Sequence, residues 1–139
     1  MIIKILNFLK FEAIDSVHYE FVAKYLEKNE NLKEFLFRFQ KESKWNEKII
    51  QNIIEINSIE ILSLISLNLI PDFLFLNVLI EKMKNLKYLD LNFKKLDVNS
   101  LLDSLERNFD SKIVEMKSHL EFENNQFTRM NKILRRNKI

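Results

Sequence analysis

The side chains that most often carry catalysis are few in this sequence and stand apart from one another. There are two histidines, His18 and His119, and no cysteine. Neither histidine belongs to a cluster with the spacing of a zinc site, and no serine lies in a nucleophile motif. We interpret the carboxylates of Glu121 and Glu123 as part of a solvated face rather than as an acid–base pair. The sequence therefore predicts a non-catalytic protein without a cofactor, a metal or a small-molecule substrate.

The amino-acid composition excludes the glycine-dependent phosphate sites. The chain of 139 residues contains no glycine and one proline, and neither a P-loop nor a dinucleotide-binding fingerprint can be built without glycine. Ile, Leu, Phe, Asn and Lys are abundant, which we attribute to an AT-rich genome. The net charge of +2 is too small to indicate nucleic-acid binding by itself.

The C-terminal stretch carries the most uneven charge in the chain. No acidic residue follows Glu123, whereas five cations do: Arg129, Lys132, Arg135, Arg136 and Lys138. One interpretation is a solvated last helix whose cations suit a helix C-terminus. The other is a contact with phosphate groups or with an acidic protein. Phe127 is the only aromatic residue close by, which disfavours sequence-specific reading of RNA bases.

Apolar residues recur every 27 residues, and this period organises the whole chain. The first column is Ile5, Leu32, Ile59, Leu86 and Ile113. Two further columns are Phe8, Phe35, Leu62, Leu89 and Met116, then Lys10, Phe37, Leu64, Leu91 and Ser118. Thirteen of the fifteen positions are apolar, in a chain that is 47% apolar. The alternation within each unit predicts a short strand with one buried face.

The second half of each unit has the apolar spacing of a helix. The expected buried faces are Ile49, Ile50, Ile53 and Ile54; Leu76, Leu79, Ile80 and Met83; Leu101, Leu102, Leu105 and Phe109; and Phe127, Met130, Ile133 and Leu134. Asn99 or Ser100 is expected to cap the helix of the fourth unit.

The segment NLKYLDLNFKKLDVNSLLDSLERN resembles a leucine-rich repeat of the ribonuclease-inhibitor-like type, and SIEILSLISLNLIPDFLFLNVLIEKMK is similar. The resemblance implies an α/β fold: a short solenoid of about five strand–helix units whose parallel strands line a concave face. It covers one domain, 1–139, with units 5–31, 32–58, 59–85, 86–112 and 113–139. The ninth position of each unit departs from the family, because it holds Ala13, Gln40, Leu67, Lys94 and Glu121 instead of Asn, Cys or Thr.

An all-α helical bundle is the alternative fold. Leu32, Phe35 and Leu36 fit a helix face as well as a strand. A spacing of seven residues also joins Ile113 to Leu120, Phe127 and Leu134, which would suit one long C-terminal helix.

In the solenoid, the third, fifth and seventh positions of each unit point outward from the sheet. We expect the partner-binding residues among them: Leu36, Arg38, Ile61, Tyr88, Asp90, Asn92, Glu115, Lys117 and His119. Leu9 and Phe11 hold the corresponding positions of the first unit. Apolar groups beside polar and aromatic ones are typical of a protein interface.

The sequence thus predicts a protein-interaction module or scaffold of leucine-rich-repeat type. The alternative is a structural subunit of a large ribonucleoprotein or organellar assembly, which the basic C-terminal stretch motivates. The absence of a membrane-length apolar run and of a secretory signal indicates an intracellular protein, cytoplasmic or organellar.

Overall fold

The computed structural model describes residues 8–13, 24, 31–39, 47–66, 73–93, 95–118 and 122–138. Within these ranges one sheet holds five strands in chain order, and every neighbouring pair is parallel. The strands are β1 (Phe8–Ala13), β2 (Glu34–Phe39), β3 (Ile61–Ser66), β4 (Tyr88–Phe93) and β5 (Glu115–Ser118). The helices are α2 (Glu47–Ile54), α3 (Phe73–Lys82), α4 (Val98–Arg107) and α5 (Asn124–Asn137).

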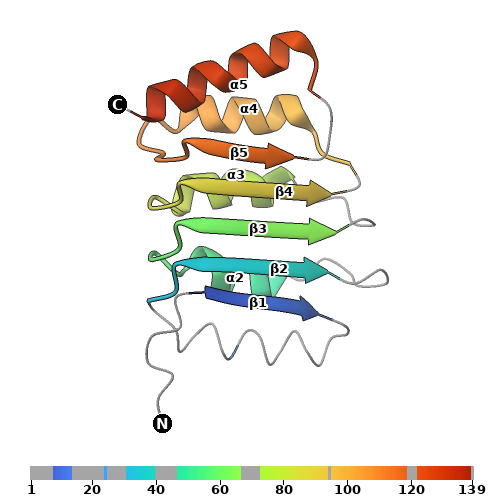
Figure 1. Ribbon diagram of the computed structural model, residues 1–139, viewed down its shortest axis with the longest axis vertical. Helices are drawn as coiled ribbons and strands as arrows, with labels where there is room; N and C mark the ends of the chain where they lie inside the picture. Colours follow the sequence, from blue (N-terminus) through green and yellow to red (C-terminus); the bar gives the residue numbers. More distant parts are fainter. Residues whose placement is uncertain are drawn as a thin grey trace.

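The arrangement is that of a mixed α/β protein with two layers (Figure 1). Each helix from α2 to α5 follows a strand, and successive helices pack on one another. Four strand–helix units are therefore complete within the described residues, and β1 adds a further strand. The alternative of an all-helical bundle is wrong, and so is the single C-terminal helix, because Glu115–Ser118 is a strand of the sheet.

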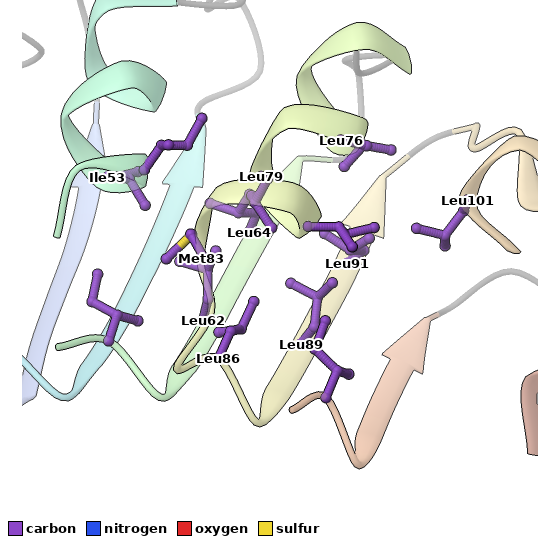
Figure 2. Close-up of a cluster of buried hydrophobic side chains, with 14 of the residues drawn as sticks. Ile53, Leu62, Leu64, Leu76, Leu79, Met83, Leu86, Leu89, Leu91 and Leu101 are labelled. Carbon is purple, nitrogen blue, oxygen red and sulfur yellow. The ribbon is translucent and has the colours of Figure 1, made fainter. Parts of the chain in front are cut away.

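The core lies between the sheet and the helices. The first predicted column is buried in every described unit, since Leu32, Ile59, Leu86 and Ile113 are at most 1% exposed. Figure 2 shows Leu62 and Leu64 of β3 and Leu89 and Leu91 of β4 on the same side of the sheet as the helices. Burying one such side chain contributes roughly 1.5–3 kcal/mol, so the repeated apolar positions are the main stabilising feature of the fold.

The 27-residue spacing holds from β2 onward and is wrong between β1 and β2. Ile61 pairs with Tyr88, and Tyr88 pairs with Glu115, as the period requires. By contrast, Leu9 pairs with Phe35 and not with Leu36. The first interval is therefore one residue shorter, and a shift of one residue exchanges the two faces of a strand.

Among the predicted helix-face residues whose burial the structure describes, two phenylalanines are exposed and the others are buried or partly buried. Leu101, Leu102 and Leu105 of α4 are fully buried. Phe109 is 79% exposed, because α4 ends at Arg107 and leaves this residue in the following turn. Phe127 of α5 is 58% exposed. The last helix has a described neighbour on one side only, so its buried face is narrow.

The cap of α4 is Asp97, and the expectation of Asn99 or Ser100 is wrong. The Asp97 Oδ1 atom accepts a hydrogen bond from the Ser100 backbone N–H at 3.1 Å, and Oδ2 accepts one from the Ser100 hydroxyl at 2.8 Å. These bonds favour the ionised carboxylate, so they hold the pKa of Asp97 below its ordinary value.

We expect Asp97→Ala to lower the free energy of unfolding by about 1 kcal/mol at neutral pH. Because the folded-state pKa of Asp97 is lowered, its ionised form stabilises the fold above the ordinary carboxyl pKa and loses this effect in acid. Urea unfolding of both proteins from pH 7 to pH 2 measures the difference. A difference that stays constant as the pH falls would contradict the assignment, and Lys95→Ala, an exposed neighbour, serves as control.

The turns that precede the strands carry polar contacts from one unit to the next. The Ser58 hydroxyl donates to the Leu32 carbonyl at 2.6 Å, and the Asn85 side-chain amide donates to the Asn57 carbonyl at 2.7 Å. Lys112 Nζ then donates to Asn85 Oδ1 at 3.2 Å. These bonds satisfy polar groups of the turns at the beginning of the strands.

Candidate functional site

One face of the sheet is free of helices throughout the described residues (Figure 1). We call it the open face. It is formed by the strand residues that alternate with the buried ones, and from β2 to β5 these are Glu34, Leu36, Arg38, Ile61, Ser63, Ile65, Tyr88, Asp90, Asn92, Glu115 and Lys117. Their side chains are half-buried or exposed, in contrast to the buried residues between them. The alternation of the strands therefore separates the core from a surface available for binding.

The parallel register arranges this face in rows that run across the strands. In one row Ile61, Tyr88 and Glu115 are neighbours. In the next row Ser63, Asp90 and Lys117 are neighbours. Side chains directly opposite each other on adjacent parallel strands lie about 5 Å apart. Apolar, aromatic, acidic and basic groups are thus collected from three strands into one small area.

A pocket with a volume of ≈ 270 Å³ lies at this junction of β3, β4 and β5. Six open-face residues line it: Ile61, Ser63, Tyr88, Asp90, Glu115 and Lys117. Leu62 and Leu89, whose side chains belong to the core, complete the lining. We refer to this site as the β3–β5 pocket.

The polar side chains of the β3–β5 pocket are not engaged with one another. Tyr88 is 40% exposed, and Glu115 and Lys117 are exposed. Within the described part of the chain, no ion pair joins Lys117 to Asp90 or Glu115. The bonding capacity of these groups is therefore available to a ligand.

The residues predicted to contact a partner divide into three groups. Ile61, Tyr88, Asp90, Glu115 and Lys117 lie together in the pocket. The remaining described residues of the prediction, Leu36, Arg38 and Asn92, lie on the same face but outside the lining. His119 lies outside the described residues. Ser63 was not among the predicted contacts, although its outward position in the alternating pattern of β3 could have identified it.

Arg129, one of the five cations considered for phosphate binding, is held within the molecule. Its guanidinium contacts the carboxylates of Asp103 and Glu106 on α4, including a bond of 2.9 Å from Nη2 to Glu106 Oε2. The hydrogen bond from Arg129 lowers the pKa of Glu106, and the two carboxylates raise the pKa of Arg129. This arginine joins α5 to α4.

Arg136 also has partners inside the molecule. It donates to the Leu105 carbonyl at 2.9 Å and to the Glu106 carbonyl at 3.1 Å, where α4 ends. Its guanidinium also lies 4.9 Å from the centre of the Phe109 ring. Three of the five predicted contacts remain exposed on α5 and its cap, namely Lys132, Arg135 and Lys138.

The described residues contain neither a metal-binding cluster nor a membrane-spanning helix. No group of three or more His, Asp or Glu side chains is placed to hold a metal ion there. None of the helices in this part of the chain has the length and apolar character required to cross a bilayer.

Comparison with known proteins adds no family to this description. No protein-family model matches the chain, and no curated protein matches it significantly. The fold and the open face are therefore the features that bear on its function.

Proposed function

We propose that this chain is a leucine-rich-repeat solenoid that binds a protein partner on its open face. The single observation that carries the proposal is the β3–β5 pocket, in which side chains from three strands meet on the face that no described helix covers. A parallel sheet normally has both faces covered, so the open face requires an explanation, and a partner supplies one.

The chemistry of the pocket suits a protein rather than a small metabolite. Its volume of ≈ 270 Å³ is below the range of roughly 300–1,000 Å³ typical of small-molecule sites. Tyrosine is among the residues that contribute most to protein interfaces, and Tyr88 lies at the centre of the pocket's first row. Ile61 supplies an apolar neighbour, and Asp90, Glu115 and Lys117 supply charged groups.

The alternative of a subunit in a ribonucleoprotein or organellar assembly has weaker support. The five C-terminal cations are one of its motivations, and two of them, Arg129 and Arg136, are bound within the molecule. Three exposed cations provide fewer phosphate contacts, so we favour the protein partner.

The double variant Tyr88→Ala/Asp90→Lys is expected to retain at least tenfold less of its partner proteins from an extract of the source cells. The Tyr88 ring would supply contact area that a partner buries, and the new lysine at position 90 reverses the charge of that side chain. Quantitative mass spectrometry of the retained proteins measures the loss, and far-UV circular dichroism verifies that the variant is folded.

The matched control is Phe127→Ala/Glu81→Lys, which removes an exposed ring and reverses an exposed acid on the helical layer. The control should retain partners as the unmodified chain does. Equal retention by both double variants would exclude the open face as the binding surface. Release of all partners by salt alone, with nucleic acid among them, would instead favour the ribonucleoprotein alternative.

A further inference from the structure

We infer that the β3–β5 pocket receives a cationic side chain, arginine above all, from an extended segment of the partner. This inference rests on the proposed function and specifies the chemistry that the same site recognises. It is carried by the placement of two carboxylates and one aromatic ring around an apolar base.

Two acidic residues adjoin Tyr88 in the sheet register and line the same pocket. Glu115 is the direct neighbour of Tyr88 on β5, and Asp90 is the next residue of β4 on the same face. A cation over the face of the Tyr88 ring would therefore be within reach of both acids. An aromatic face attracts cations through its quadrupole, and carboxylates add charge-assisted hydrogen bonds.

The charge within the pocket is complementary to a single cation. Asp90 and Glu115 contribute two negative charges, and Lys117 contributes one positive charge. Since no ion pair joins Lys117 to either acid within the described residues, it does not consume their hydrogen-bonding capacity. One added cation balances the pocket, whereas an added anion would face two carboxylates.

Arginine fits this arrangement better than lysine does. Its planar guanidinium can stack on a ring while its edge donates to carboxylates in a fork, which an ammonium group cannot do. The methylene stem of arginine would lie against Ile61, the aliphatic open-face residue of the lining. Ser63, on the next row, offers a hydroxyl as acceptor.

The test uses an array of heptapeptides with varied flanking residues and a central arginine, citrulline, norleucine or glutamate. Citrulline keeps the shape of arginine and removes its charge. We expect the full chain, fluorescently labelled, to bind arginine peptides about tenfold more strongly than citrulline peptides on average. Asp90→Asn/Glu115→Gln should abolish this preference, whereas Lys117→Gln should leave it intact or increase it.

The control Glu55→Gln/Glu81→Gln removes two exposed carboxylates from the helical side and changes the net charge equally. It should keep the arginine preference, because only local acids are proposed to matter. Equal binding of arginine and citrulline peptides by the unmodified chain would overturn the inference. So would an equal loss of the arginine preference in Asp90→Asn/Glu115→Gln and in the control variant. The preference for arginine peptides could be absent while Tyr88→Ala/Asp90→Lys still releases the partners. In that case the inferred cationic specificity is wrong, and the proposed binding of a protein on the open face is retained.

Discussion

Replacing Leu91 with alanine is expected to lower the free energy of unfolding by about 2–5 kcal/mol. Leu91 is 0% exposed and lies on β4, between β3 and β5, on the core side of the sheet. Its removal leaves a cavity that neighbouring residues on both adjacent strands and on the helices fill only in part. Such a loss is large compared with the roughly 5–15 kcal/mol that stabilise a typical domain.

Asn92 is the matched control for this prediction, because it is the next residue on the same strand and belongs to the open face. Asn92→Ala should change the free energy of unfolding by about 0.5 kcal/mol or less. Chemical denaturation followed by circular dichroism measures both values. Similar losses from the two variants would mean that the assignment of the two sheet faces is wrong.

Replacing Arg136 with alanine is expected to lower the free energy of unfolding by about 2 kcal/mol. Its guanidinium bonds to the carbonyls of Leu105 and Glu106, which lie in the last turn of α4 and have no partner further along that helix. The variant also loses the contact with the Phe109 ring. Amide hydrogen exchange should be accelerated more in α5 than in β3, because the removed bonds join α5 to the end of α4.

Arg136→Lys distinguishes the contribution of the positive charge from that of the hydrogen-bonding geometry of the guanidinium. Lysine keeps the positive charge near the helix end but cannot contact several carbonyls with one planar fork, so we expect it to recover less than half of the loss. Arg135→Ala, an exposed neighbour on α5, should change the free energy of unfolding by about 0.5 kcal/mol or less. If Arg135→Ala were as destabilising as Arg136→Ala, the internal bonds of Arg136 would not explain the effect.

The resemblance to a leucine-rich repeat predicted the mixed α/β arrangement, and the alternating pattern predicted the two sheet faces from β2 onward, whereas the all-helical alternative is wrong. A strand has a side-chain period of two, so once this segment is a strand, Phe35 and Phe37 share the buried face and Leu36 lies on the other. The same period identified Tyr88 and Asp90 as outward residues. Periodicity is reliable here because it reflects burial directly.

The first strand was the exception, and its residues do not fit the 27-residue alignment. In the 27-residue alignment Lys10 falls in a column that is otherwise apolar up to Leu91. The observed register instead places Leu9 beside Phe35 and Lys10 beside Leu36. A regular period cannot reveal a unit that is one residue shorter, so the available signals were Lys10 in an apolar column and the apolar Leu9 and Phe11 at positions expected to point outward.

The internal roles of Arg129 and Arg136 could not be predicted from the sequence. Both were counted with the exposed cations, because local charge gives no information about partners more than twenty residues away. The carboxylates and carbonyls that they contact belong to α4, and only the packing of α5 on α4 brings these groups together. The β3–β5 pocket likewise combines side chains of three strands, so its shape follows only from the three-dimensional arrangement of these strands.

The uniform register has a consequence for how the chain folds. Each strand pairs with residues 26 or 27 positions away, whether it is β2 or β5. The entropy lost on closing a loop grows with the length of that loop, and here every closure involves nearly the same length. Adding a further unit would therefore leave the entropic barrier of each pairing step unchanged, and the folding rate would depend on one loop closure instead of on total chain length.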